Sequence, residues 1–108
     1  PVETYKANIQ SIIDTIRGLN AEADIVIVST IRANPEGSQD KALPTAYSAA
    51  DKELCEENER VVSVDMTRFS DLLYQKKKGV DILANNVNHP SDFLMRCYDM
   101  CLLKTLTK

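Results

Sequence analysis

The stretch Asp24-Ile25-Val26-Ile27-Val28-Ser29 decides the fold class of this chain. It is a continuous β-branched run rather than an alternating one, and such runs are typical of parallel, interior strands covered on both faces. A second short strand is predicted over residues 61–64, after a helical pattern marked by Tyr47, Ala50 and Leu54. Strand, helix and strand in this spacing predict a βαβ unit with parallel strands.

Three further helical patterns surround this unit. Apolar residues recur at helical spacing over residues 5–16, 66–73 and 94–106, with a polar turn before the last pattern, which Ser91 can cap. The element order predicts one domain, residues 1–108, built as a three-layer α/β/α sandwich with two parallel strands and about four helices. Two strands are few for that architecture, so we expect an exposed strand edge.

Composition excludes several classes of function. The net charge is -3, and the three consecutive lysines at residues 76–78 have no interleaved aromatic residues, so we expect no nucleic-acid partner. No apolar run approaches the roughly 20 residues that span a bilayer. Cys97 and Cys101 lack the further ligands of a metal site, and no glycine-rich loop follows either strand, so no cofactor or metal is predicted.

The single histidine, His89, lies in the segment Asn85-Asn86-Val87-Asn88-His89-Pro90-Ser91-Asp92-Phe93, directly before the last helix. Pro90 disfavours a helical conformation at His89, and a capping Ser91 starts the helix immediately afterwards. The imidazole is therefore expected on an exposed loop, where it can take and return a proton at neutral pH. The alternative is a histidine that only caps or packs.

Residues 88–93 resemble the SGNH/GDSL-type hydrolases, which end in an Asp-x-x-His-Pro type loop followed by their last helix; one subgroup reads Asn-His-Pro-x-Asp-Phe. The helix opening Tyr5-Lys6-Ala7-Asn8-Ile9 and the two strands, the second closing in Asp65, look similar to theirs as well. The resemblance implies the C-terminal half of a flavodoxin-like esterase domain. It also implies hydrolysis of carboxylic esters, such as acyl or acetyl groups on carbohydrate.

By this resemblance His89 is the general base that deprotonates a serine and then the acid that protonates the leaving alcohol. The family's usual aspartate aligns with Asn86, which can orient an imidazole but cannot offset its positive charge. Either the site works as a Ser-His dyad oriented by Asn86, or Asp92 or Asp81 supplies the carboxylate. Asp92 also fits the first turn of a helix, where an acidic side chain is favoured.

The family's serine motif and its oxyanion-hole residues lie upstream of the portion matched here, and none of the seven serines has that context. We therefore expect little catalysis from this chain alone, and association with itself or with a missing N-terminal half. One alternative is a non-catalytic α/β module that pairs with a partner chain. Another is a domain that binds a cofactor or phosphate at the strand ends. The long loop over residues 30–45 is expected to shape the pocket.

Overall fold

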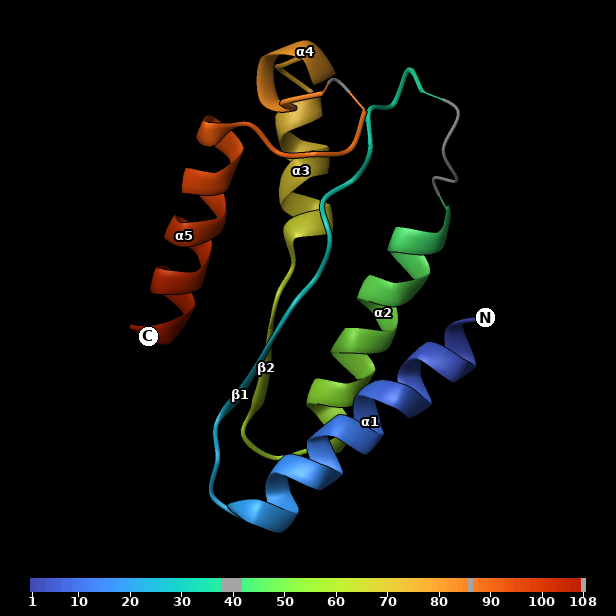
Figure 1. Cartoon of the computed structure of the whole chain (residues 1–108), viewed down its shortest axis with the longest axis vertical. Helices are drawn as coiled ribbons and strands as arrows, with labels where there is room; N and C mark the ends of the chain where they lie inside the picture. Colours follow the sequence, from blue (N-terminus) through green and yellow to red (C-terminus); the bar gives the residue numbers. More distant parts are fainter. Residues whose placement is uncertain (38–41, 86, 108) are drawn as a thin grey trace.

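The structure is a computed structural model that describes residues 1–37, 42–85 and 87–107. Within these residues the chain forms five helices and two strands (Figure 1). In chain order they are α1 (Val2–Leu19), β1 (Ile25–Val28), α2 (Ala42–Glu57), β2 (Val61–Val64), α3 (Met66–Tyr74), α4 (Gly79–Ile82) and α5 (Asp92–Leu106). No helix in the described part is long and apolar enough to cross a membrane.

The two strands form a parallel sheet, which confirms the predicted βαβ unit. Ile25 lies opposite Val61, and Val28 lies opposite Val64. The backbone N–H of Ile25 donates to the carbonyl oxygen of Arg60 at 2.9 Å, which starts the ladder. Because the strands are parallel, their carboxyl ends open on one edge, where ligand sites of α/β proteins occur.

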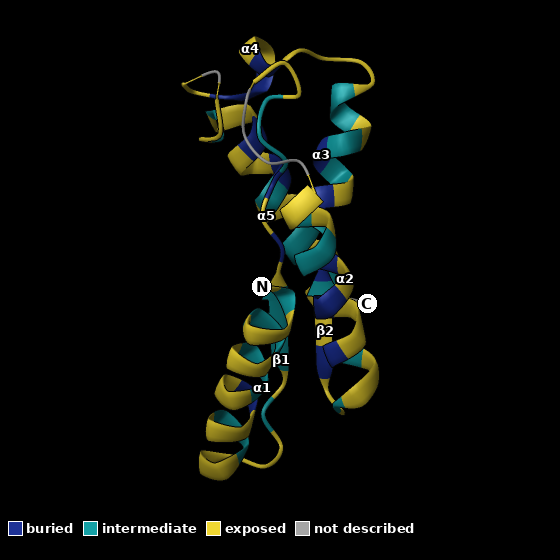
Figure 2. Ribbon diagram, turned by 90° about the vertical axis from the view of Figure 1, so that its right-hand side faces the viewer, coloured by how far each residue is buried: buried dark blue, intermediate teal, exposed yellow. Residues whose placement is uncertain are grey.

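Alternating side chains direct the two faces of the sheet into two apolar clusters. On one face, Ile25, Ile27 and Val61 pack against Ile13 of α1 and Leu54 of α2. On the other face, Val26 and Val64 pack with residues of α3, α4 and α5; its fully buried members are Met66, Ile82 and Leu94. Helices therefore lie on both faces, as the sandwich prediction requires. Figure 2 shows the most deeply buried residues along β2 and the helices around it.

Two local predictions were wrong. The loop after β1 was expected to reach residue 45, but α2 already begins at Ala42, so Pro44 lies in its first turn. A proline is tolerated there because the first N–H groups of a helix have no intrahelical partner. The predicted polar turn also contains α4, whose Ile82 is fully buried. A four-residue helix is too short to show a periodic pattern.

Candidate functional site

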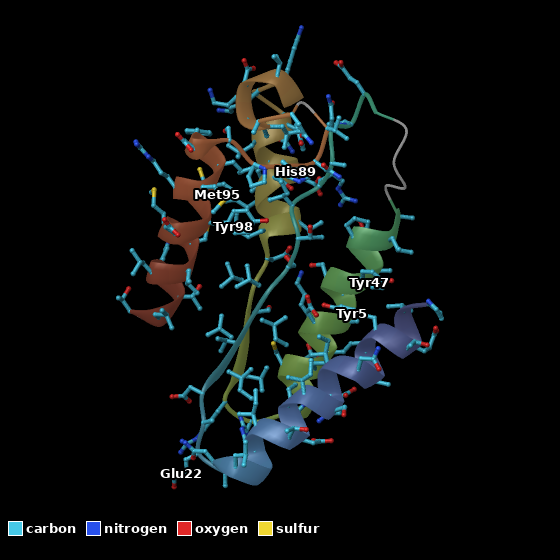
Figure 3. All side chains as sticks on the ribbon, in the orientation of Figure 1. Tyr5, Glu22, Tyr47, His89, Met95 and Tyr98 are labelled. Carbon is cyan, nitrogen blue, oxygen red and sulfur yellow. The ribbon has the colours of Figure 1, made fainter. Side chains whose placement is uncertain are left out.

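His89 lies in a short turn between α4 and α5, here called the His89 turn and defined as the described residues 84, 85 and 87–89. The ends of this turn are tied together, because Leu83 and Pro90 form an antiparallel bridge. The backbone N–H of Ala84 also donates to the carbonyl oxygen of His89 at 2.7 Å. His89 is exposed, as expected from the sequence. Figure 3 shows it at the end of the molecule where the strands terminate.

Asn85 shapes the His89 turn through its side-chain amide. Its Oδ1 accepts hydrogen bonds from the backbone N–H groups of Val87, Asn88 and His89, each at 3.0 Å. Asparagine commonly bonds nearby backbone in this way and so stabilises a turn. The three bonds fix which end of the amide is oxygen. The amide Nδ2 therefore faces Asn88 Oδ1 at 3.2 Å and His89 Nδ1 at 3.0 Å.

The shortest contact of the His89 ring favours one tautomer. Asn88 Oδ1 lies 2.7 Å from His89 Nδ1, and an amide oxygen can only accept a hydrogen bond. This shorter contact favours the ring proton on Nδ1, because two facing lone pairs would repel at 2.7 Å. The donor Asn85 Nδ2, at 3.0 Å from the same nitrogen, favours the other tautomer. With the proton on Nδ1, the Nε2 atom presents a lone pair, and it has no partner among the described residues. This is the tautomer that a general base in a Ser-His pair requires.

Of the three residues predicted to orient His89, namely Asn86, Asp92 and Asp81, the two that the structure describes share no hydrogen bond with its ring. Asn86 lies outside the described residues. Asp92 is the first residue of α5 and shares no hydrogen bond with His89 in the described part of the chain. Asp81 Oδ2 accepts from the backbone N–H of Lys78 at 2.9 Å, so its carboxylate caps α4. The ring is instead contacted by two other asparagines of the same segment.

The predicted cap of the last helix is confirmed, because Ser91 Oγ accepts from the backbone N–H of Leu94 at 3.4 Å. The roles of Asn85 and Asn88 were missed by the sequence reasoning. The available signal was the repetition of asparagine at residues 85, 86 and 88, since this residue bonds turns locally. Family spacing drew attention to Asn86 alone.

The loop after β1 joins the His89 turn to two helices. The backbone N–H of Asn34 donates to the carbonyl oxygen of Val87 at 2.7 Å. The backbone N–H of Ile31 donates to the hydroxyl of Tyr98 on α5 at 3.1 Å, and the N–H of Arg32 donates to Ser70 Oγ on α3 at 2.8 Å. These bonds hold the loop at the carboxyl end of the sheet, where the sequence placed it.

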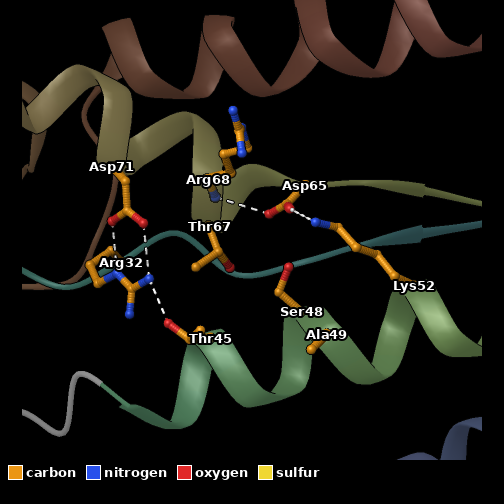
Figure 4. Close-up of a pocket in the computed structure, with 9 residues that line it drawn as sticks. All are labelled: Arg32, Thr45, Ser48, Ala49, Lys52, Asp65, Thr67, Arg68 and Asp71. Atoms are coloured by element: carbon orange, nitrogen blue, oxygen red, sulfur yellow. Dashed lines mark hydrogen bonds and ion pairs between the residues drawn. The ribbon is translucent and has the colours of Figure 1, made fainter.

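A recess of 270 Å³ opens at the same edge, between α2, α3 and this loop (Figure 4). Arg32 forms one of its walls: Nε and Nη2 contact the two carboxylate oxygens of Asp71 at 2.8 and 2.9 Å. Nη2 also donates to Thr45 Oγ1 at 2.8 Å. Two-point contact of this kind holds a guanidinium in one orientation. The loop after β1, which was predicted to shape a pocket, thus contributes Arg32 to the recess. Thr45, the predicted last residue of that loop, also lines the recess but lies on α2.

A second ion pair lines the opposite side of the recess. Lys52 Nζ lies 3.1 Å from Asp65 Oδ2, and Asp65 Oδ1 caps α3 by accepting from the backbone N–H of Arg68 at 2.9 Å. Burial alone would raise the pKa of Asp65, but the hydrogen bonds from Arg68, Lys52 and Ser48 together lower it. The charges that line the recess are therefore largely paired, which suits a polar ligand held by hydrogen bonds.

The cysteines do not supply a nucleophile at this site. All three are free, and Cys97 is buried among apolar residues of α5. Burial raises the pKa of the Cys97 thiol, which disfavours the reactive thiolate. No group of three or more histidine, cysteine or acidic residues that could hold a metal ion occurs in the described part of the chain.

No protein-family model, no curated protein and no solved structure matches this chain.

Proposed function

We propose that this chain is the C-terminal part of a flavodoxin-like SGNH/GDSL-type serine esterase, and that His89 is its general base. The observation that carries the proposal is the state of the His89 ring. Its Nδ1 is held by Asn88 at 2.7 Å, and its Nε2 has no partner among the described residues. The resemblance of residues 88–93 to the family's last loop supports the same role.

In the proposed reaction Nε2 takes the proton of a serine hydroxyl as that oxygen attacks the ester carbonyl, and then returns it to the departing alcohol. Asn88 keeps the ring oriented while it is positively charged, because the Nδ1–H bond to Oδ1 persists in both states. An amide does not offset the charge as a carboxylate does. In a serine-protease triad, replacing the aspartate by asparagine costs about four orders of magnitude in rate, because the amide holds the imidazole in the wrong tautomer.

The serine and the donors for the developing oxyanion come, in this proposal, from an upstream portion of the protein. The substrate class is a carboxylic ester, with an acylated or acetylated carbohydrate favoured. The recess at the carboxyl edge of the sheet, which is lined by no residue of the His89 turn, supports a hydroxyl-rich alcohol, since Thr45, Ser48 and Thr67 line it together with two ion pairs. Groups of these kinds donate and accept hydrogen bonds without demanding a charged ligand.

The first test compares hydrolysis of p-nitrophenyl acetate by this chain and by a form of the protein extended upstream in its gene. We expect activity in the extended form alone, and a loss of about 10²- to 10⁴-fold in kcat for His89→Ala. An extended form that is folded and inactive would remove the esterase proposal. The alternative, a non-catalytic α/β module that pairs with a partner chain, would then be favoured.

A second test concerns the orienting residue. In the extended form, Asn88→Ala should lower kcat and Asn88→Asp should raise it, because a carboxylate offsets the imidazolium charge. In this chain alone, long-range ¹H–¹⁵N NMR should show the ring proton on Nδ1, and Asn88→Ala should shift it toward Nε2. Asp92→Asn should leave both readouts unchanged. If instead it lowers kcat and Asn88→Ala does not, Asp92 is the orienting acid.

A further inference from the structure

The side chains of β1 are more exposed to solvent than is usual for a strand made only of β-branched apolar residues. None of its four β-branched residues is buried, and Val28 is 44% exposed. In β2, Val61 and Val64 are buried and Val62 is 47% exposed. Continuous apolar strands of this kind are normally covered on both faces and paired on both edges. Among the described residues, β1 is paired with β2 alone, so its apolar character is left without a partner on one side.

The open edge of β1 presents unpaired backbone groups. In a parallel ladder, successive residues direct their N–H and C=O groups to opposite sides. Ile25 and Ser29 donate to β2, at 2.9 and 3.0 Å, so the peptide groups of Val26 and Val28 face the open side. Natural edge strands are commonly protected by a lysine, a proline or a bulge. β1 has none of these, and its register with β2 is unbroken.

An apolar groove of 360 Å³ lies at the carboxyl end of β1, between Val28, the last residue of that strand, and α5. Val28, Met95 and Leu102 line it, together with Pro90, Tyr98 and Asp99. Figure 3 shows Met95 and Tyr98 on α5 beside the strands. Met95 is 48% exposed. A strand added to β1 would therefore form hydrogen bonds with the free backbone groups of β1, and its side chains on the α5 face would contact an apolar surface.

The solvent-accessible surface of the chain is larger than that of a compact monomer of the same mass. The chain exposes 7112 Å², whereas a compact monomer of 12.1 kDa exposes about 6,000 Å². The excess of about 1,100 Å² is comparable with the ~800 Å² that each partner buries in a standard protein interface. The radius of gyration, 15.0 Å, likewise exceeds the ~13 Å of a compact domain of this length.

We propose that two copies of this chain associate through β1, in antiparallel pairing about a twofold axis, and form one continuous four-stranded sheet; this inference does not rest on the proposed function, whose upstream portion would compete with the second copy for a sheet edge. Centring the axis on Ile27 places Val26 opposite Val28 of the second copy, so the outward N–H and C=O groups bond reciprocally. The same axis puts both α5 helices on one face, where they close the groove. The net charge of -3 is small, so repulsion between copies is weak.

The test is sedimentation velocity of this chain between about 1 and 100 µM, the range in which interfaces of modest strength dissociate. We expect a monomer–dimer equilibrium. Val28→Lys should raise the dissociation constant by at least about tenfold, because it places two charges at the joined edges. Leu43→Lys is the matched control: Leu43 is also 44% exposed but lies on α2. It should leave the dissociation constant unchanged.

Amide hydrogen exchange provides a readout that does not depend on a variant's folding. The amides of Val26 and Val28 should exchange more slowly as protein concentration rises. A chain that stays monomeric over the whole range overturns the proposal and leaves the edge to a strand from a different protein. A dimer in which these two amides stay unprotected also overturns it, as do assemblies that grow beyond two copies.

Discussion

Asp65 stabilises the carboxyl edge of the sheet in two separable ways, and two substitutions distinguish them. The residue follows β2, caps α3 through Oδ1 and pairs with Lys52 through Oδ2. Asp65→Ala removes the cap and the ion pair together. Asp65→Asn keeps a side-chain oxygen that can accept from the backbone N–H of Arg68, and removes only the charge.

The expected magnitudes differ enough to be measured. Loss of an N-cap acceptor costs about 0.5–2 kcal/mol. Lys52 is 56% exposed, so solvent screens its pair with Asp65, which should contribute less than about 1 kcal/mol. We therefore expect Asp65→Ala to lower the free energy of unfolding by about 0.5–3 kcal/mol, the sum of the two ranges. Asp65→Asn should lower it by less than about 1 kcal/mol.

Urea denaturation at pH 7 and at pH 3 measures both effects. The pKa of Asp65 is lowered in the folded chain, so the native carboxylate contributes stability above the unfolded pKa. That contribution is lost as the pH falls through the folded pKa. The difference between the wild-type chain and Asp65→Asn should therefore shrink toward pH 3. Equal losses for the two variants at pH 7, or a difference that does not change with pH, would refute this reasoning.

Two further predictions concern the packing of α2. Asp51 is 1% exposed, its Oδ1 accepts from the Tyr5 hydroxyl at 2.7 Å, and its Oδ2 has no hydrogen-bond partner among the described residues. Burial raises the pKa of Asp51. The wild-type chain should therefore lose stability relative to Asp51→Asn as the pH rises from about 4 to 7. Thermal unfolding at each pH measures this difference in stability, and a difference that stays constant would contradict the prediction. Leu54 is fully buried, so Leu54→Ala should cost about 2–5 kcal/mol in urea denaturation. A loss below about 1 kcal/mol would mean that the face of the sheet covered by α1 and α2 is not tightly packed.

The main elements could be predicted because each rests on a local pattern. The helical spacing of apolar residues, the β-branched run that forms β1 and the capping Ser91 are all properties of short segments. The parallel pairing of β1 with β2 followed from the strand, helix, strand order. The position of His89 in an exposed turn followed from Pro90 and the cap beside it.

Other features depend on contacts between segments distant in the sequence. Arg32 and Asp71 look like ordinary surface charges until the loop after β1 folds against α3. α4 is held by the burial of Ile82, which no four-residue pattern can reveal. Which asparagine holds the ring is decided by the closure of the His89 turn, since that brings Asn88 Oδ1 to His89 Nδ1.

The sequence by itself therefore determined the class of the fold and the residue that carries the proposed chemistry, because both depend on residue type and spacing. The tertiary structure decided the contacts of His89 Nδ1 with Asn85 and Asn88, the paired charges of the recess and the open edge of β1. These depend on the distances and the burial that arise only when the helices and strands pack together.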